Sequence, residues 1–405
     1  MSVKVRESDH CEIGQTGISS FKDNPSSVAS FLLSHPCLVS NIARVPSSSR
    51  PFSRIVLGST AGMRLLNLSN PDSTKQILDN VTRELEEVSM GMMSDARILT
   101  GEEEGVDGWV TVNYLNGGLV DGEGNMMGAL DWGGASSQIS RMVDDGNKGD
   151  RRITLYGQDY ELLTRSHLCY GQAEALNRHK AGLVYRVYKE HGNLTMKVPD
   201  PCLPQGALGE TIPLTKLYSS PCTHMVDTEF MNKINQSQDN VTFIPDQNRT
   251  TCLSTITDLF TPSTCLAMFV PQAGENTCLD PSTIPPPGIT KYFAFSTYWY
   301  LTDRLGLQTN FPLEKLVDIS EQLCQAHINS TPLAPLGSVA SIACFQATYM
   351  TQLLTKGYHF NSSTWPQISF VSEIDETGIG WGLGYAVAQA NGLPPTDGRQ
   401  YIRYT

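Results

Sequence analysis

Apolar residues recur along the chain with two different spacings. Ile77, Val81 and Leu85 are four residues apart, so they share one face of an amphipathic helix that we predict over 72–88. The uninterrupted apolar run at 55–57 instead predicts a buried strand. Strands and helices that alternate in this way are typical of an α/β fold.

The same reasoning gives the other expected elements. They are strands at 2–7, 96–99, 153–156 and 368–371, and helices near Pro25 and over 110–115, 160–189, 291–305, 313–327, 340–356 and 378–391. The helix expected over 291–305 is rich in aromatic residues, which is more typical of a core helix than of a ligand site. Residues 193–290 show no clear period and hold five of the ten cysteines, so we expect a loop-rich region cross-linked by disulfides.

The composition is that of a folded protein long enough for two domains. Of the 405 residues, 40% are hydrophobic and 17% are charged. The 41 acidic and 29 basic residues leave a net charge of −12, which argues against a nucleic-acid partner because such surfaces are basic. An anionic substrate stays compatible with this charge, since a local loop and a metal ion can hold it.

The cysteines and the potential glycosylation sites indicate the secretory pathway. None of the ten cysteines belongs to a Cys-x-x-Cys pair, and their even number suggests five disulfides. Eight Asn-x-Ser/Thr acceptors agree, at Asn67, Asn80, Asn193, Asn235, Asn240, Asn248, Asn329 and Asn361. The first ten residues lack the apolar core of a signal peptide, and no apolar run is long enough to span a membrane. We therefore expect the N-terminus to be incomplete.

The first candidate site is a strand–turn–strand stretch around the adjacent glycines Gly133 and Gly134. Such a turn lets bare backbone N–H groups approach an anion. Asp131, at the end of the first strand, is suited to hold a hydrated divalent cation beside a phosphate. Ser136 and Gln138 share one face of the second strand, where both can touch a water or a phosphate oxygen. The same pattern is also common in ordinary hairpins.

Two further stretches carry candidate chemistry. The strand at 54–57 runs into the small-residue turn 58–64 ahead of a helix, an arrangement in which backbone amides and a hydroxyl bind phosphate. A close-packed turn explains this pattern equally well. Residues 100–109 hold three consecutive glutamates between glycines, for which we expect a solvated loop. The functional alternative is a general base where a strand crosses into a helix.

These stretches, in this order, resemble the apyrase regions of the ectonucleoside triphosphate diphosphohydrolases, and the cell-surface branch of that family most of all. The matching residues are 57–64 for the second region, 100–109 for the third, 130–139 for the fourth and 380–385 for the fifth. Glu102 replaces the usual glutamine of the third region, and Trp132 and Ser137 are substitutions in the fourth. The segments 156–160 and 168–171 carry a further signature of the branch.

The resemblance implies two actin-like, RNase-H-type domains with the active site in the cleft between them. We expect the first domain at 1–98 plus 372–405 and the second at 99–371, with disulfide-stapled insertions. The family's first apyrase region, which carries a metal-side aspartate and a phosphate clamp, is not found ahead of Cys11. Its flanking membrane spans are not found either. We therefore expect the first domain to lack its first strands.

The resemblance also implies how the reaction is divided among the residues. Glu104 would act as the general base that takes a proton from water. Ser136 and Gln138 would orient that water. The residues expected to hold phosphate oxygens are Thr60 and Ala61 from one domain and Gly133, Gly134 and Ala135 from the other.

The metal, the base and the disulfides follow from the same resemblance. Asp131 would bind Ca²⁺ or Mg²⁺ through water, and Trp381 would line the metal side. Tyr298 or Trp299 would stack on the nucleobase, although the arginine expected near Val339 is missing. The expected disulfides are Cys11–Cys37, Cys169–Cys222, Cys202–Cys252, Cys265–Cys278 and Cys324–Cys344.

The function implied is hydrolysis of nucleoside tri- and diphosphates, of the ATP, ADP, UTP and UDP class, to the monophosphate at the cell surface. The alternative is a truncated, catalytically impaired apyrase-like protein that binds nucleotide. A sugar-kinase-like phosphotransferase is disfavoured, because an activated-water site suits hydrolysis. We expect no nucleic-acid partner and membrane attachment only through spans outside this chain. A homo-oligomer is compatible with the resemblance.

Overall fold

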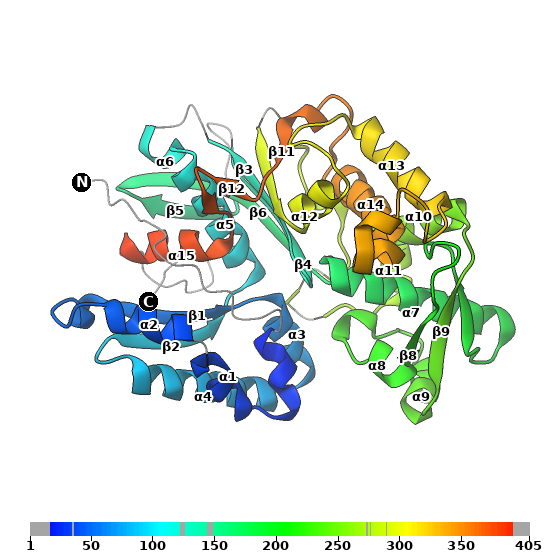
Figure 1. Cartoon of the computed structure of the whole chain (residues 1–405), viewed down its shortest axis with the longest axis horizontal. Coiled ribbons are helices and arrows are strands. Elements are labelled where there is room, and N and C mark those ends of the chain that lie inside the picture. Colours follow the sequence, from blue (N-terminus) through cyan, green and yellow to red (C-terminus); the bar gives the residue numbers. More distant parts are fainter. Residues whose placement is uncertain are drawn as a thin grey trace. The chain divides into compact units, whose positions relative to one another are not determined.

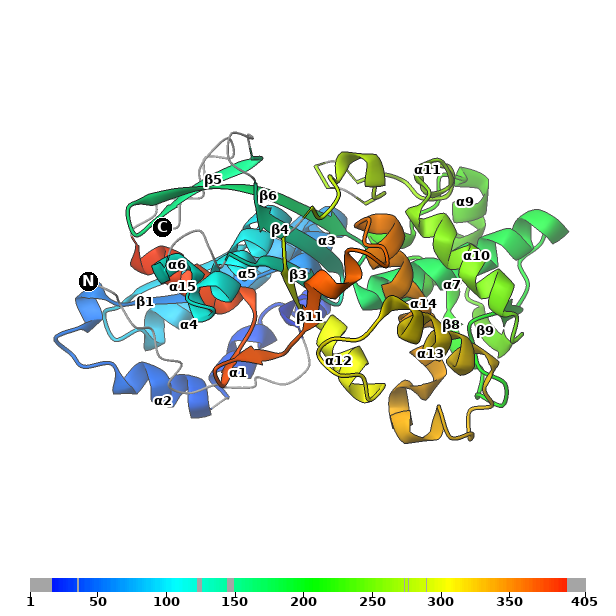
Figure 2. The same cartoon turned by 90° about the horizontal axis from the view of Figure 1, so that it is seen from above.

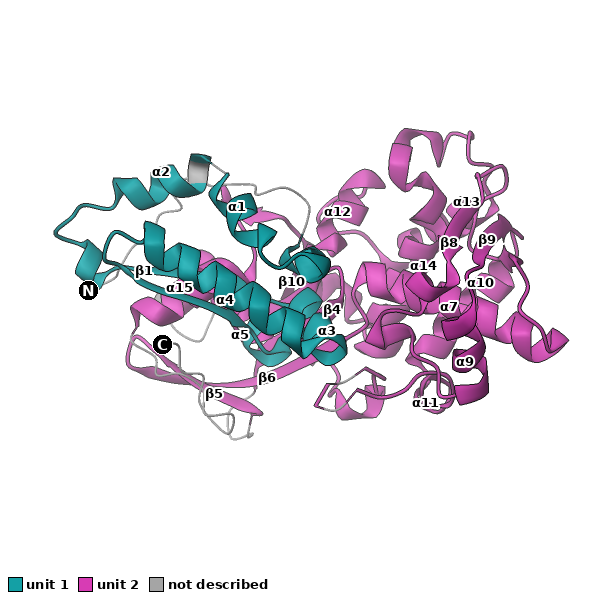
Figure 3. Cartoon of the chain, turned by 90° about the horizontal axis from the view of Figure 1, so that it is seen from below, with its two compact units in different colours: residues 1–104 teal, residues 105–405 magenta. Residues whose placement is uncertain are grey.

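A computed structural model describes the chain over residues 17–34, 36–121, 126–143, 149–272, 274–275, 277–288 and 290–391. Helices and strands alternate in a mixed α/β fold, as predicted (Figure 1). The chain divides into two compact units, residues 1–104 and 105–405 (Figure 3). The strand expected at 2–7 lies outside the described residues.

A two-stranded parallel sheet organises the first unit. The elements of this unit are η1 (Ile18–Asp23), α1 (Ser27–Leu33), α2 (Pro36–Arg44), η2 (Arg50–Phe52), β1 (Arg54–Ser59), α3 (Ala61–Ser69), α4 (Pro71–Val88) and β2 (Met93–Ile98). β1 and β2 pair from Arg54 with Met93 to Ser59 with Ile98. Parallel strands need a crossover connection, which α3 and α4 supply.

The core of the first unit forms along the apolar face of α4, which confirms the predicted amphipathic helix. The core cluster consists of Val28, Leu32, Met63, Leu66, Ile77, Val81 and Leu85. Asn70 caps the helix by accepting a hydrogen bond from the Ser73 N–H at 3.0 Å. Pro71 follows at the first helical position, where its missing N–H costs nothing.

A six-stranded sheet organises the second unit, with the strand order β11-β10-β3-β4-β6-β5 (Figure 2). Its strands are β3 (Gly128–Trp132), β4 (Ser136–Met142), β5 (Arg151–Leu155), β6 (Gln158–Leu168), β10 (Tyr292–Ser296) and β11 (Ile368–Phe370). β11, β10 and β3 are parallel, whereas β3, β4, β6 and β5 are antiparallel. The β3–β4 hairpin is therefore central and has a paired strand on each side.

Helices and short strands surround this sheet. They are α5 (Gly101–Leu115), α6 (Gly118–Asp121), α7 (Gln172–His191), β7 (Lys197–Asp200), β8 (Glu210–Pro213), α8 (Leu214–Leu217), η4 (Pro221–Thr223), α9 (Thr228–Gln236), β9 (Asn240–Pro245), α10 (Arg249–Thr257), η5 (Asp258–Phe260), α11 (Pro262–Met268), η6 (Pro281–Thr283), α12 (Thr297–Arg304), α13 (Leu313–Gln325), η7 (Ala334–Ile342), α14 (Ala343–Gln352), η8 (Leu353–Gly357), η9 (Trp365–Gln367), β12 (Glu373–Ile374), β13 (Thr377–Gly378) and α15 (Trp381–Ala390). The region expected to be loop-rich thus contains a three-stranded sheet, β7-β9-β8, and several helices.

Two predicted long helices are wrong. Residues 158–168 form β6, because pairing with β4 and β5 satisfies this segment's backbone groups on both edges. The helix α7 begins only at Gln172. The aromatic segment divides likewise into β10 and α12 at Ser296, whose φ of +58° interrupts any continuous helix. In both cases tertiary pairing outweighs local pattern.

The C-terminal helix α15 packs on α5 and belongs to the second compact unit. We predicted that residues 372–405 complete the first domain. The Gly384 N–H donates to Thr111 Oγ1 at 2.7 Å, and a Cβ on Gly384 would lie 1.8 Å from the Asp107 carbonyl oxygen. The expected domain boundaries stay a prediction. Among the helices of the described residues, none combines the length and apolar character needed to cross a bilayer.

Candidate active site

The β3–β4 hairpin has the strand–turn–strand geometry predicted for it. Asp131 pairs with Gln138 and Trp132 with Ser137, and the Gly133 N–H donates to the Ser136 carbonyl at 3.0 Å. The turn between the strands is three residues long, 133–135. Gly134 is exposed at its tip, so a ligand can reach the backbone there.

The carbonyl groups of this turn all point towards neighbouring elements. Gly133 O accepts from the N–H of Gln172 at 2.9 Å, and Gly134 O accepts from that of Ala173 at 2.8 Å, both in the first turn of α7. Ala135 O accepts from the Cys169 N–H at 2.8 Å. In a trans peptide the N–H points opposite to the preceding carbonyl. The N–H groups of Gly134 and Ala135 therefore point away from α7, an arrangement that is compatible with anion binding.

Gly171 allows this close approach, and our sequence analysis gave it no role of its own. A Cβ at Gly171 would lie 2.2 Å from the Ala135 nitrogen, so any side chain there would displace the turn. The residue has φ −70° and ψ 159°, so the requirement is space and not backbone conformation. The sequence signal was a glycine directly ahead of a helix, inside a segment that we had assigned to a longer helix.

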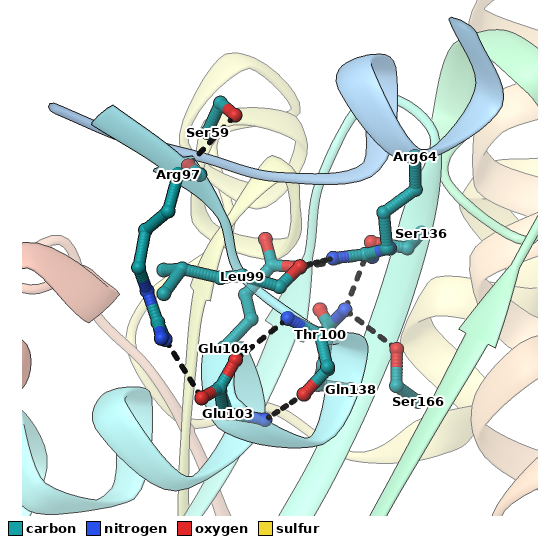
Figure 4. Close-up of polar contacts among 10 residues, drawn as sticks. All are labelled: Ser59, Arg64, Arg97, Leu99, Thr100, Glu103, Glu104, Ser136, Gln138 and Ser166. Carbon is teal, nitrogen blue, oxygen red and sulfur yellow. Dashed lines mark hydrogen bonds and ion pairs between the residues drawn. The ribbon is translucent and has the colours of Figure 1, made fainter. Parts of the chain in front are cut away.

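Ser136 and Gln138 lie together, as their spacing predicted. Gln138 Nε2 donates to Ser136 Oγ at 2.8 Å and to Ser166 Oγ at 3.0 Å (Figure 4). All three side chains are buried, so the amide is held in one orientation. Ser166, on β6 opposite Gln138, was missed because the alternation of its strand was taken for part of a helix.

The glutamate stretch is a helix and not the solvated loop that we expected. Glu103 Oε2 accepts from the Thr100 N–H at 2.8 Å, and Thr100 Oγ1 accepts from the Glu103 N–H at 3.1 Å. This reciprocal pair is a capping box, whose Thr-x-x-Glu signature was visible in the sequence. Arg97 Nη2 also donates to Glu103 Oε1 at 2.7 Å. The Glu103 side chain is therefore engaged in hydrogen bonds at the start of α5.

Glu104, the next residue, forms a buried ion pair within the first unit. Its Oε2 accepts from Arg64 Nη1 at 3.0 Å and from Arg64 Nη2 at 3.1 Å (Figure 4). Arg64 Nη1 also donates to the Leu99 carbonyl at 3.0 Å. The guanidinium fixes the direction of the Glu104 carboxylate. Arg64 was missed, although it ends the small-residue turn that we had singled out.

Gly105 follows Glu104 in α5 and packs against the second unit's sheet. A Cβ at Gly105 would lie 2.8 Å from both Ser140 Oγ and Thr164 Oγ1, and 3.4 Å from the Gln138 Cβ. Glycine is needed here because the helix backbone approaches β4 and β6 too closely for a side chain. Our sequence analysis included this glycine in the third apyrase region but gave it no role of its own.

The turn after β1 is a strand-to-helix junction, as predicted. Thr60 occupies the N-cap of α3, and its side chain makes no capping hydrogen bond. Ala61 is the first helical residue and is buried. A cavity of about 270 Å³ adjoins the turn and is lined by Gly17, Ile18, Ser19, Phe31, Leu32, Leu57, Gly58, Ser59, Thr60, Gly62 and Met63. The helix start with an unengaged hydroxyl is compatible with phosphate binding.

The two metal-side candidates lie on separate elements of the second unit. Asp131 is buried at the end of β3, and its carbonyl accepts from Ser137 Oγ at 3.1 Å. Trp381 is half-buried at the start of α15. Among the described residues, the His, Cys, Asp and Glu groups close enough to share one ion lie elsewhere, at Cys202. A single carboxylate of this kind fits a hydrated Ca²⁺ or Mg²⁺ better than a fully protein-ligated ion.

Of the two candidate base-binding aromatic residues, Tyr298 offers no surface to a ligand. Its side chain is fully buried, with its ring centroid 5.3 Å from that of Trp132. Trp299 is half-buried and meets Tyr300 edge-on at 5.2 Å. Tyr300, which we had not selected, is 57% exposed. An accessible aromatic surface therefore exists at 299–300.

Four of the five expected disulfides are present. They are Cys169–Cys222, Cys202–Cys252, Cys265–Cys278 and Cys324–Cys344. The fifth, Cys11–Cys37, lies outside the described residues and side chains. Cys169 itself donates its N–H to the Ala135 carbonyl, so its disulfide with Cys222 anchors a residue that supports the 133–135 turn.

Comparisons with known proteins give the family of this chain. The profile of the GDA1/CD39 (nucleoside phosphatase) family matches residues 2–398. Ectonucleoside triphosphate diphosphohydrolase 8 of Rattus norvegicus is 33% identical over 399 residues, covering 95% of this chain and 76% of the relative. Ectonucleoside triphosphate diphosphohydrolase 2 of Rattus norvegicus is 31% identical over 409 residues, covering 96% and 77%.

One solved structure supports the fold. The nucleoside triphosphate hydrolase structure from Neospora caninum matches 90% of this chain and 78% of its own, with a TM-score of 0.59 and 16% identity. Together with the ordered apyrase regions and the four expected disulfides, these matches show that the chain belongs to the GDA1/CD39 (nucleoside phosphatase) family.

Proposed function

We propose that this protein hydrolyses nucleoside tri- and diphosphates to the monophosphate, by attack of a water molecule that Glu104 deprotonates. The observation that carries the proposal is the 133–135 turn, in which the N–H groups of Gly134 and Ala135 point away from α7. The names of its relatives support a nucleoside tri- or diphosphate as substrate. Such a reaction needs positioning, charge neutralisation and one base, and it needs no covalent nucleophile.

The phosphate contacts in this proposal come from backbone groups. The N–H groups of Gly134 and Ala135, with Gly133 at the start of the turn, bind phosphate oxygens. Thr60 and Ala61 add the hydroxyl and the N–H groups at the start of α3. Backbone donors of this kind are fixed before the ligand arrives, so little reorganisation accompanies binding.

Glu104, Ser136 and Gln138 orient and activate the attacking water molecule. Gln138 is held by Ser136 and Ser166, which leaves the amide oriented for a water molecule that attacks phosphorus. Glu104 accepts the proton. Two observations are consistent with this assignment: Arg64 fixes the direction of the carboxylate, and the adjoining Gly105 packs against Gln138. Ser166 and Arg64 are positioning residues in this scheme.

A divalent ion, Ca²⁺ or Mg²⁺, would be held through water by Asp131, with Trp381 on the metal side. When bound, it neutralises phosphate charge. The nucleobase stacks on Trp299, with Tyr300 beside it, while the buried Tyr298 supports this surface from the core. Stacking of this kind tolerates different bases.

An extracellular setting fits the covalent features. The four disulfides need an oxidising compartment. Seven of the eight acceptor asparagines are exposed and the eighth, Asn80, is half-buried, so glycans can be attached without unfolding. We propose that the protein acts on extracellular nucleotides.

The test is phosphate release from ATP and ADP by the full chain made in a secretory host, with Ca²⁺ or Mg²⁺. Glu104→Gln should reduce kcat by about 10²–10⁴-fold, because it removes the base and keeps the shape. Glu102→Gln, on the same helix, introduces the family's usual residue and should keep the activity. A wild-type chain that binds ATP without hydrolysing it would support the impaired nucleotide-binding alternative. Equal rates for both variants would remove the base assignment.

A further inference from the structure

The side chain of Ser137 lies on the opposite face of β4 from Ser136 and Gln138. Its Oγ donates to the Asp131 carbonyl at 3.1 Å and accepts from the Tyr358 hydroxyl at 2.9 Å. Ser137 and Tyr358 are both fully buried. Ser137 thereby joins the end of β3 to the start of β4 from the core side, and Tyr358 holds Ser137.

The backbone around Tyr358 is irregular on both sides. Before it, α14 widens into the π-turn 353–357, and the Tyr358 N–H donates to the Leu353 carbonyl at 3.0 Å. After it, His359 has a φ of +63°, a conformation that costs a non-glycine residue free energy. Turns and strained residues of these kinds concentrate at functional sites. Here they bring the tyrosine hydroxyl to Ser137.

Other strained residues lie beside the same hairpin. Cys169 has a φ of +74°, and its N–H donates to the Ala135 carbonyl. Ser296 has a φ of +58° and pairs with Trp132 in the β10–β3 register. Three of the positive-φ, non-glycine residues among the described part of the chain thus belong to segments that contact this hairpin. The other five described residues of this kind, Met90, Tyr156, Gln247, Asp375 and Glu376, lie in other segments.

The Tyr358 hydroxyl can act only as a fixed neutral donor. Burial raises its pKa well above the usual value, so it stays protonated. The Ser137 hydroxyl donates its one hydrogen bond to the Asp131 carbonyl, and the same oxygen accepts a hydrogen bond from the Tyr358 hydroxyl. Replacing tyrosine by phenylalanine removes this donor and keeps the ring.

We infer that Tyr358 is a positioning residue, which fixes the phosphate- and water-binding hairpin through Ser137. The catalytic part of this inference rests on the proposed function. Without the hydroxyl, Ser137 loses its fixed orientation, and the strands can shift relative to each other at the turn. A misplacement of about 1 Å lowers catalysis far more than it lowers binding of a flexible polyphosphate.

The test compares Tyr358→Phe with Tyr218→Phe in the full chain. Tyr218 is a matched control, because its buried hydroxyl donates to the Ala181 carbonyl at 2.8 Å, away from the hairpin. We expect Tyr358→Phe to lower kcat for ATP by about tenfold or more with little change in KM, whereas Tyr218→Phe leaves both near wild type. Ser137→Ala should reproduce the loss, and Ser137→Thr, which keeps the hydroxyl, should restore most of the rate.

A second measurement does not depend on turnover. Deuterium uptake by the segment 131–138 should rise in Tyr358→Phe and stay unchanged in Tyr218→Phe. If Tyr358→Phe has the same kcat and the same deuterium uptake as Tyr218→Phe, the inference is wrong and the proposed function stands. If wild type hydrolyses no nucleotide, the proposed function fails and the catalytic part of this inference fails with it; the uptake difference then decides whether Tyr358 holds the hairpin.

Discussion

The two turns that we propose for phosphate binding are supported in different ways. The 133–135 turn joins two central strands, and each of its carbonyls accepts an N–H from α7 or Cys169. The turn after β1 leaves a two-stranded sheet and enters α3, with no side-chain cap at Thr60. Near the second of these turns, the polar links include a buried ion pair, Arg64–Glu104.

This difference teaches how each unit fixes its chemistry. In the second unit several backbone hydrogen bonds together hold the 133–135 turn, so the loss of one hydroxyl should disturb only the structure near it. In the first unit the buried Arg64–Glu104 pair joins α3 to the start of α5, so the loss of one partner should be felt throughout the unit. All five tryptophans lie in the second unit, so their fluorescence reports on that unit while circular dichroism reports on both.

The largest effect should come from Arg64→Ala. Removing one partner of a buried pair leaves an uncompensated charge, which typically costs about 3–5 kcal/mol. Arg97→Ala is the control, because Arg97 is partly exposed and its bond to Glu103 is worth less. Urea unfolding followed by circular dichroism should show the loss more strongly than tryptophan fluorescence does. Equal destabilisation by the two substitutions would contradict the contrast between the units.

The next largest effect should be a difference in stability between alanine substitutions at two glycines, one at each turn. In Gly171→Ala the new Cβ meets the Ala135 nitrogen at 2.2 Å, and backbone cannot move aside cheaply. Overpacking of this kind costs about 1–3 kcal/mol, and we expect the upper end together with loss of phosphate release. In Gly62→Ala the nearest atom is Ser19 Oγ at 3.0 Å, which can rotate away. Thermal unfolding of both variants tests this, and a milder effect of Gly171→Ala would refute it.

A smaller effect should appear on acidification, in the second unit. Burial first, and Arg165 second, lower the pKa of His167 from 6.5 to about 3. Neutral His167 therefore stabilises the fold above pH 6.5, and this stability is lost as the pH falls from 6.5 towards 3. At pH 5 the loss is about 2 kcal/mol. Tryptophan-detected urea unfolding at pH 7 and pH 5 should show it.

The control for the pH effect is His167→Phe, which cannot take up the proton. His167 packs near Tyr170 and Tyr358, so an aromatic replacement suits the site. The variant should lose less stability between pH 7 and pH 5 than wild type does. An identical loss would mean that other groups bind the protons.

Several parts of the fold follow from local pattern. The helix α4 was predictable because its apolar face, its Asn70 cap and Pro71 all agree. The strand β1 and the β3–β4 hairpin were predictable from apolar runs and glycines. The capping box of Thr100 and Glu103 was also readable in the sequence, but we expected a solvated loop there because three carboxylates lie between glycines.

The pattern of the sequence predicted the α/β class, and its family resemblance supplied the candidate residues Glu104, Ser136 and Gln138 and the pairing of four disulfides that the structure confirms. Only the tertiary structure decided that residues 158–168 form a strand, because the deciding hydrogen bonds come from β4 and β5. It alone revealed Arg64, Ser166, Gly171 and Tyr358. Each of these acts on a residue at least 28 positions away, and no local period records such a contact.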